Sequence, residues 1–416
     1  MSKKVFFKTF GCRTNQFDTQ IMISKLNDFV LTHNESEADI VVVNSCTVTN
    51  GADSSVRGYI NSVKRKNFAS KVILAGCGAH SKGEELFKKG ELFGVFGHSE
   101  KENINALLQK NNRFYEIGDL NHIDSSVVTE FVGKSRAFIK VQEGCDFRCS
   151  YCIIPYVRGN ARSLPLEQIK EQVRALASNG FGEFILTGTN VGSYGKERDS
   201  SIAKLIKELS KIRGVRRIRI GSLEPIQIDD EFIELLNEPF MAKHLHIALQ
   251  HTADKMLLYM NRRNRYIEDL KLFEKIASYG YALGTDFIVG HPGESDTIWK
   301  EALERVKDLP LTHIHAFTYS PRDNTPSALI KERINGKISK ERHKELTTLI
   351  KKKNLEFRKK HNKDLVVLIE DEKDGIYRGY DQFYNQVLVE SNNDLKHNWI
   401  FLENAVAKER ANYAIL

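Results

Sequence analysis

Three cysteines in the middle of the chain have the type and spacing of metal ligands. Cys145, Cys149 and Cys152 form a C-x3-C-x2-C run within the sequence GCDFRCSYC. Structural zinc takes four close ligands, and this run has no fourth Cys or His beside it. An iron–sulfur cluster held by three thiolates leaves one iron open, whereas electron-transfer clusters generally use four thiolates. The run therefore predicts a [4Fe-4S] cluster with one position free for a further ligand.

This spacing is the signature of the radical S-adenosylmethionine (SAM) superfamily. The amine and carboxylate of SAM can chelate the open iron, and an electron from the cluster can then break the sulfonium bond to give a carbon radical. The run follows the strand-like segment Phe138–Gln142 and precedes helix-like sequence, which is the context that the signature requires. We therefore expect SAM to bind beside Cys145, Cys149 and Cys152.

The other three cysteines are far apart, but each comes just after an apolar strand-like segment. The pairs are Val5–Phe10 with Cys12, Asp39–Asn44 with Cys46, and Lys71–Ala75 with Cys77. Parallel strands in an open α/β sheet bring their carboxyl ends to one rim, where ligands bind. We expect these thiolates to hold a second [4Fe-4S] cluster, again with one free iron; the alternative is three buried structural cysteines.

The elements around the cysteines predict an α/β protein built from several parts. Residues 1–130 read as an open parallel α/β domain, with helices expected at 18–29 and 52–66. Residues 135–330 alternate strands and helices and predict a partial (β/α) barrel, which places its chemistry at the carboxyl ends of the strands. A basic linker helix (331–363) and a small C-terminal β-barrel (364–416) follow. The expected barrel strands are 137–141, 183–187, 217–221, 244–249, 284–289 and 313–318.

Length and charge narrow the class of protein. The 416 residues suit two or three domains, and 41% apolar with 28% charged residues excludes a disordered or collagen-like chain. The net charge of +8 is uneven, because residues 331–363 hold 13 Lys and Arg against 4 Glu, whereas 364–416 hold 5 against 10 acidic residues. The basic stripe suits RNA, or is simply a solvated helix. With no signal-peptide core and no membrane-spanning run, we expect a cytoplasmic protein without disulfides.

Over essentially its whole length the sequence resembles the methylthiotransferase family of radical-SAM enzymes. That family joins an N-terminal domain with three cysteines, a radical-SAM barrel and an RNA-binding TRAM β-domain. The matching stretches are TFGCRTNQFD (9–18), NSCTVTN (44–50), GCGA (76–79), GCDFRCSYCIIP (144–155), RGNARS (158–163) and MNRR (260–263).

Two segments indicate the branch of the family. The CTVTN that begins at Cys46 and the LTGTNVGSYG of residues 186–195 look most like the branch acting on threonylcarbamoyladenosine in tRNA. The other branches act on isopentenyladenosine in tRNA and on an aspartate of a ribosomal protein. One departure is Gln250-His251-Thr252, where the family usually has Gln-Ser-Gly.

The resemblance implies a reaction that replaces an aromatic C–H of the modified adenosine by C–S–CH3. The cluster at Cys145, Cys149 and Cys152 would cleave SAM to a radical that abstracts the hydrogen. The second cluster would present sulfur, and a second SAM would supply the methyl group. The implied partners are the tRNA anticodon stem-loop and a low-potential electron donor, and we expect a monomer. No residue is assigned as a catalytic acid or base.

The family's SAM contacts carry over onto the ends of the barrel strands. Gly188 would let the backbone approach the methionine moiety, Glu224 would accept ribose hydroxyls, and Tyr151 would lie by the adenine. Alternatively, Glu224 caps the helix that follows it. The complete set of expected SAM contacts is Tyr151, Gly188, Asn190, Ser222, Glu224 and Gln250.

Other polar and aromatic residues allow more than one interpretation. Four histidines alternate along two expected strands and are interpreted as polar barrel lining rather than a metal pair: His244, His246, His313 and His315. Phe383 and Tyr384 are either core residues or platforms for RNA bases. From a different class of function, the alternative for the whole chain is a non-catalytic iron–sulfur protein that binds RNA or senses redox state.

Overall fold

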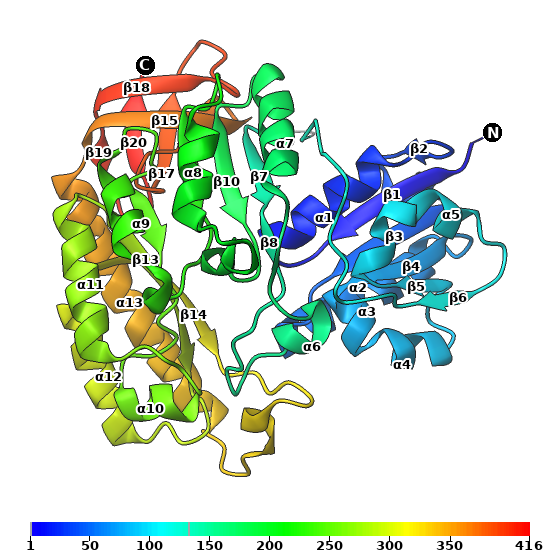
Figure 1. The fold of residues 1–416 in the computed structure, drawn as a ribbon, viewed down its shortest axis with the longest axis horizontal. Helices are drawn as coiled ribbons and strands as arrows, with labels where there is room; N and C mark the ends of the chain where they lie inside the picture. The colour runs from blue at the N-terminus through cyan, green and yellow to red at the C-terminus, as the bar shows by residue number, and fades with distance from the viewer. Residues whose placement is uncertain (1, 132–133) are drawn as a thin grey trace.

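The computed structural model describes residues 2–131 and 134–416, and its amino-terminal part is a parallel sheet covered on both faces (Figure 1). Val41 and Val43 pack on one face with α2, and Ile40 and Val42 pack on the other with α5. Burial on both faces explains why the strands are continuous apolar runs. In sheet order the strands are β2 (Val30–Leu31), β1 (Lys4–Thr9), β3 (Ile40–Ser45), β4 (Lys71–Gly76), β5 (Gly94–Phe96) and β6 (Phe114–Glu116).

The helices of this part correct one prediction and confirm another. The helix expected at 18–29 is wrong in position: α1 runs from Arg13 to Ser24, directly after Cys12. Its first turns bury polar side chains such as Asn15, which donates to Phe10 O (2.8 Å), so apolar periodicity does not mark the start. The second helix is confirmed, because Thr49 accepts from Ala52 N and starts it. The remaining bounds are α2 (Asn50–Lys66), α3 (Cys77–Ser81), α4 (Gly83–Lys88) and α5 (Ile104–Gln109).

The middle of the chain forms a partial barrel, as the sequence predicts. Two parallel sheets, β11-β10-β7 and β12-β13-β14, enclose one hydrophobic core, and the bridge Leu223↔Ile247 links them. The strands are β7 (Arg136–Lys140), β10 (Glu183–Thr187), β11 (Arg217–Ile220), β12 (His244–His246), β13 (Ala282–Val289) and β14 (Leu311–Thr318). The helices are α6 (Ile154–Arg158), α7 (Leu166–Ser178), α8 (Ile202–Ser210), α9 (Asp230–Glu234), α10 (Asp254–Tyr259), α11 (Tyr266–Ser278) and α12 (Asp296–Asp308).

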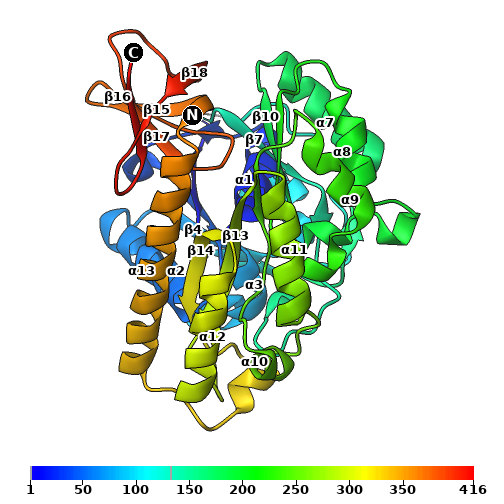
Figure 2. The same ribbon diagram turned by 90° about the vertical axis from the view of Figure 1, so that its left-hand side faces the viewer.

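A long helix connects the barrel to a curled antiparallel-rich sheet. The expected basic helix is present as α13, but it runs only from Gly336 to Lys360 rather than over 331–363, and it lies beside the barrel strands β13 and β14 in Figure 2. Phe383 is buried in the core of the sheet, so its interpretation as a core residue is confirmed. In order, the strands are β18 (Trp399–Asn404), β15 (Lys363–Lys373), β16 (Ile376–Tyr380), β17 (Gln386–Glu390), β20 (Asn412–Ile415) and β19 (Val406–Ala407).

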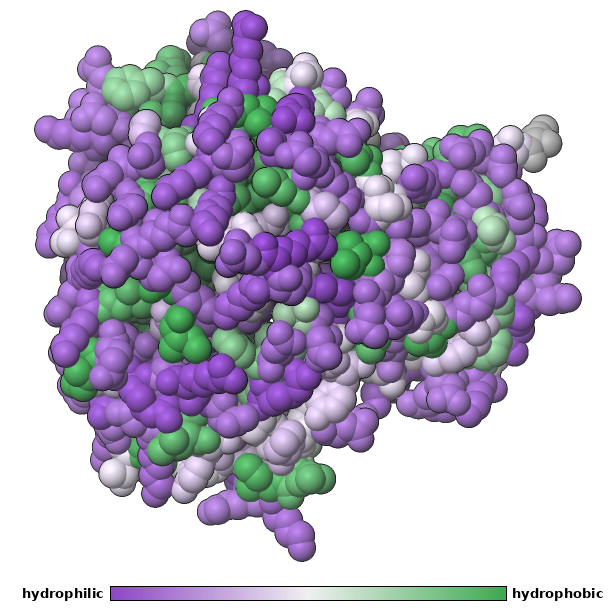
Figure 3. Space-filling view, viewed as in Figure 1, coloured by the Kyte–Doolittle hydropathy of each residue, from purple (hydrophilic) through white to green (hydrophobic). Residues whose placement is uncertain are grey.

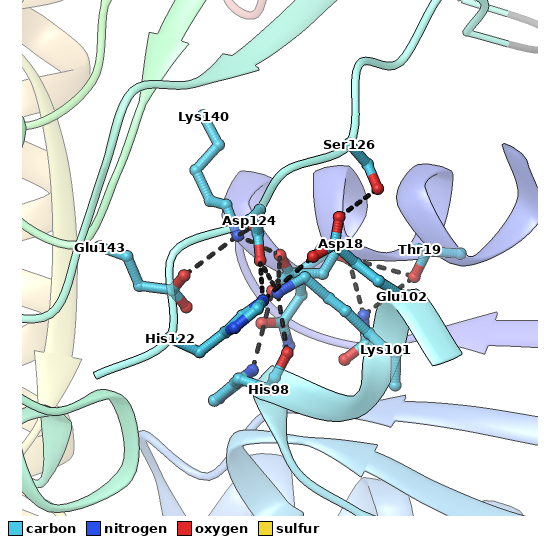
Figure 4. Close-up of polar contacts among 12 residues, drawn as sticks. Asp18, Thr19, His98, Lys101, Glu102, His122, Asp124, Ser126, Lys140 and Glu143 are labelled. Atoms are coloured by element: carbon cyan, nitrogen blue, oxygen red, sulfur yellow. Dashed lines mark hydrogen bonds and ion pairs between the residues drawn. The ribbon is translucent and has the colours of Figure 1, made fainter. Parts of the chain in front are cut away.

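Buried ion pairs join the amino-terminal sheet to the barrel (Figure 4). Lys140 on β7 lies 2.6 Å from Asp18 on α1 and 3.1 Å from Glu143, and it also contacts Asp124. Lys101 contacts Asp124 as well, and all five side chains are at most 3% exposed. Burial alone would raise the pKa of Asp18, but the ammonium groups of Lys140 and Lys101 outweigh it and hold that pKa below its usual range. The two parts therefore dock through compensated charges.

The outer surface differs from this charged interior. The face shown in Figure 3 is mostly hydrophilic, with hydrophobic side chains scattered over it. Within residues 2–131 and 134–416, no helix combines the length and the apolar character that crossing a membrane requires.

Replacing Lys140 by Met should destabilise the protein by about 3–5 kcal/mol, because Asp18 and Asp124 lose a buried counter-ion. Urea unfolding followed by far-ultraviolet circular dichroism measures the change. The control is Lys88→Met, which removes an exposed pair with Glu84 and should unfold at the wild-type urea concentration. Equal midpoints for both variants would show that the buried pairs do not hold the two parts together.

Candidate functional site

Cys12, Cys46 and Cys77, here called the amino-terminal trio, gather at one rim of the first sheet. They follow β1, β3 and β4, which are neighbours in the sheet, so the expected convergence at the strand ends is found. Gly11, at φ +97°, allows the close approach, since a Cβ there would lie 2.6 Å from Cys46 Cβ. Cys12 is exposed and Cys77 is buried, so the trio opens to one side.

Cys145, Cys149 and Cys152, the barrel trio, line a cavity of ≈ 320 Å³ at the carboxyl ends of the barrel strands, here called the first cavity. Gly188 does not line it: its missing Cβ makes room for Gln142 O, 2.7 Å from where a Cβ would stand, and it faces the neighbouring cavity. The expected SAM contacts that line the first cavity with the trio are Tyr151, Asn190, Ser222, Glu224 and Gln250.

The donor chemistry of both trios fits metal–sulfur groups. Burial, with a smaller contribution from the neighbouring cysteines, raises the pKa of Cys77 and of Cys152 to about 12, although Arg158 lowers that of Cys77. Three thiolates at one opening repel each other unless a cation lies among them, which is how metal binding couples to thiol deprotonation. In the first cavity Thr189 Oγ1 and Asn190 Oδ1 are buried without a hydrogen-bond partner among the described residues, as expected where a polar ligand binds.

One short helix connects the two trios. Helix α6 begins just after Cys152 and ends at Arg158, whose Nε donates to Cys77 Sγ at 3.3 Å. Ile153 and Val157 pack against Cys77. Because the same few residues touch both trios, their relative position is fixed by covalent and packing contacts together.

Arg262 organises the other side of the barrel trio. Its Nη1 donates to Glu224 Oε1 (2.8 Å) and lies 3.8 Å from Cys149 Sγ. Its Nε donates to Asn264, which in turn donates to Asp269 at 2.7 Å. This chain of contacts aims the Glu224 carboxylate at the first cavity.

Sequence reasoning assigned no role to Arg158 or Arg262. The only signal for them was their place in the matching stretches RGNARS and MNRR. Glu224 also starts the short helix after it, since the two side chains of Glu224 and Gln227 form a capping box. The capping interpretation of Glu224 is thus confirmed alongside its position at the cavity.

A second cavity, of ≈ 400 Å³, adjoins the first, and most of the residues that line it have polar or charged side chains. Asp286 and Ser222 line both cavities, and Cys12 of the amino-terminal trio lines the second. His246 Nε2 and His315 Nδ1 lie 3.1 and 3.3 Å from Asp286 Oδ1. The four barrel histidines all line this cavity, which agrees with their interpretation as polar lining, and His246, Asp286 and His315 lie close enough together to share a metal ion.

Comparisons with known families and structures agree with this geometry. The family model described as "Uncharacterized protein family UPF0004" matches residues 4–97, and the "Radical SAM superfamily" model matches residues 139–306. The radical S-adenosylmethionine methyltransferase TsrM from Kitasatospora setae has a similar fold, with a TM-score of 0.62 at 15% identity over 79% of this chain and 77% of TsrM. The fold and the three-cysteine loop define a radical-SAM enzyme.

Relatives narrow the class further. A Helicobacter pylori protein, assigned to the methylthiotransferases only provisionally, is 55% identical over 99% of this chain and 100% of its own. A threonylcarbamoyladenosine tRNA methylthiotransferase of Aquifex aeolicus is 36% identical (89% and 93%), and a tRNA-2-methylthio-N(6)-dimethylallyladenosine synthase of Fervidobacterium nodosum is 32% identical (91% and 90%). The chain belongs to the methylthiotransferase family of radical-SAM enzymes, and this membership implies a [4Fe-4S] cluster and SAM.

Replacing Asp269 by Asn should remove a pH dependence of stability. Burial raises the pKa of Asp269 to about 7, so the folded state holds a proton that the unfolded state releases near pH 4. Asp269 therefore contributes a loss of stability as pH rises from about 4 to about 7, and Asp269→Asn should lack that contribution, so its stability relative to wild type should rise over this range. Urea unfolding at pH 5 and pH 8 tests this, with the exposed Asp230→Asn as control. Identical profiles for wild type and Asp269→Asn would contradict it.

Proposed function

We propose that this chain is a tRNA N(6)-threonylcarbamoyladenosine C2-methylthiotransferase. The observation that carries the proposal is the pair of cysteine trios, which open onto two adjoining cavities and are connected through α6. Each trio would hold a [4Fe-4S] cluster, and SAM would serve as radical source and methyl donor. Two trios at adjoining cavities that share Ser222 and Asp286 would suit a reaction that joins sulfur to a carbon.

The residues of the first cavity would bind SAM and keep its surroundings dry. When bound, the cluster and SAM supply radical chemistry. An aromatic C–H needs such chemistry because acids and bases do not activate it. Glu224, oriented by Arg262, accepts ribose hydroxyls, and Asn190 meets the polar end of the ligand. Apolar side chains on the same wall, such as Leu223 and Ile288, exclude water from the reacting atoms.

The substrate assignment rests on relatives and on the second cavity. Threonylcarbamoyladenosine tRNA methylthiotransferases of Aquifex aeolicus, Thermotoga maritima and Bacillus subtilis are 31–36% identical to this chain. The polar lining of the second cavity suits a polar substituent on the adenosine better than an isopentenyl group. The basic helix α13 would attract the phosphates of an anticodon stem-loop, and a low-potential donor would supply electrons.

Anaerobically reconstituted wild-type protein should bind about eight iron per chain, against about four in Cys12→Ser and in Cys145→Ser. Cys12→Ser should still cleave SAM to 5′-deoxyadenosine under reduction, because only the barrel trio adjoins the first cavity. Cys145→Ser should not. Iron analysis and chromatography of the nucleoside measure both quantities. A wild-type protein with iron but without SAM cleavage would instead indicate a non-catalytic iron–sulfur protein.

Deletion of the gene should remove methylthio-threonylcarbamoyladenosine from tRNA hydrolysates and leave threonylcarbamoyladenosine in its place. Mass spectrometry of nucleosides measures the change, and re-expression of the wild-type protein, but not Cys145→Ser, should restore it. Loss of the methylthio derivative of isopentenyladenosine instead would assign the chain to the other tRNA branch. Unchanged tRNA would point to a protein substrate.

A further inference from the structure

The second cavity contains a guanidinium, that of Arg13, for which the described residues provide no ion-pair partner. Arg13 follows Cys12, and its Nη2 donates to the hydroxyl of Tyr384, 2.6 Å away in the turn between β16 and β17 of the C-terminal sheet. Among the described residues, no carboxylate forms an ion pair with this half-buried guanidinium. The other arginine of the cavity, Arg219, is already compensated, because it lies 2.5 Å from Glu183 and also donates to a main-chain carbonyl. Of these two guanidinium groups, that of Arg13 is therefore the one without an ion-pair partner among the residues that the structure describes.

The remaining ionisable groups of the cavity do not compensate Arg13. Asp286 contacts His246 and His315, and it forms no ion pair with Arg13 in the part of the chain that the structure describes. Burial lowers the pKa of His313 to about 3 and that of His244 well below its usual range, so both rings are neutral. His244 Nε2 is buried with no hydrogen-bond partner in the described part of the chain. Among the described residues that line the cavity, Arg13 thus has no carboxylate partner, and His244 offers a ring nitrogen without a hydrogen bond.

We propose that Arg13, together with His244, binds the carboxylate of the threonyl group of the substrate nucleoside. The inference rests on the proposed function and deepens it, since it names the residues that separate the two tRNA branches. Cys12 lines the second cavity, which shares Ser222 and Asp286 with the first, so a base bound at the first cavity would have room to extend its N6 substituent here. An isopentenyl group would leave the guanidinium desolvated and without a partner, and the site would reject it.

Binding of RNA hairpins to the reconstituted protein, with SAM but without reductant, tests this. Three anticodon stem-loops differ only in the target base: threonylcarbamoyladenosine, isopentenyladenosine and adenosine. Wild type should bind the first most tightly. Arg13→Met should lower the affinity for that hairpin by about 10- to 100-fold, which is the value of a charge-assisted contact, and should leave the affinity for the adenosine hairpin unchanged. Equal losses for all three hairpins would mean that Arg13 contacts a backbone phosphate, which overturns the proposal.

Matched variants separate charge from structure. Arg13→Lys keeps a positive charge beside Cys12 but loses the planar guanidinium, and it should retain part of the preference for threonylcarbamoyladenosine. Arg174→Met, on the exposed face of α7, should behave as wild type. Iron content and circular dichroism confirm that Arg13→Met is folded; if it is not, Arg13→Gln provides the same measurement.

The outcomes distinguish this inference from the proposed function. If wild type prefers the threonylcarbamoyladenosine hairpin and Arg13→Met shows the same preference, only the role of Arg13 is overturned. A wild-type protein with no preference, or with a preference for isopentenyladenosine, would overturn the proposed function itself.

Discussion

The contact between the Arg158 guanidinium and the Cys77 thiol is the constraint on which the arrangement of the site depends. Arg158 is 1% exposed, and besides Cys77 it meets Asp18 at 3.0 Å and contacts Glu143. Burial alone would lower the pKa of this arginine, but the thiol and the two carboxylates outweigh it and raise that pKa. A buried cation tolerates little displacement, because losing a partner leaves an uncompensated charge. The end of α6 is therefore held against the amino-terminal trio.

The ion pairs around Lys140 extend this constraint over the whole boundary between the first sheet and the barrel. Parts of one chain that meet through small polar contacts usually move relative to each other. Here the contacts are buried and charged, from Asp18 on α1 to Lys140 on β7. Radical chemistry between two cavities tolerates little misalignment of its reacting groups. A charged boundary with directional contacts fixes a relative position that an apolar one would leave free to slide.

Sequence reasoning succeeded where structure is local or follows a topological rule. The three residues Cys12, Cys46 and Cys77 were placed together because parallel strands end at one rim, and the loop of Cys145 is read from its spacing alone. It failed where a residue acts through distant parts of the chain. Arg158 meets Cys77 across 81 positions, and no periodicity records such a contact. His251, where the sequence departs from the family's usual Gln-Ser-Gly, has a structural role. Its ring is buried against Phe287 and Glu294 and does not enter either cavity.

The C-terminal sheet contributes to the site as well as to the surface. Its net charge is negative, which argues against phosphate binding as its main task, yet Tyr384 reaches the second cavity among Arg13, Arg136 and Arg219. Burial alone would raise the pKa of Tyr384, but these guanidinium groups outweigh it and lower that pKa. The second cavity is thus closed by the first sheet, the barrel and the C-terminal sheet together. No one of these parts contains the complete surface, so under the proposed function recognition of the substrate base would require that all three fold against each other.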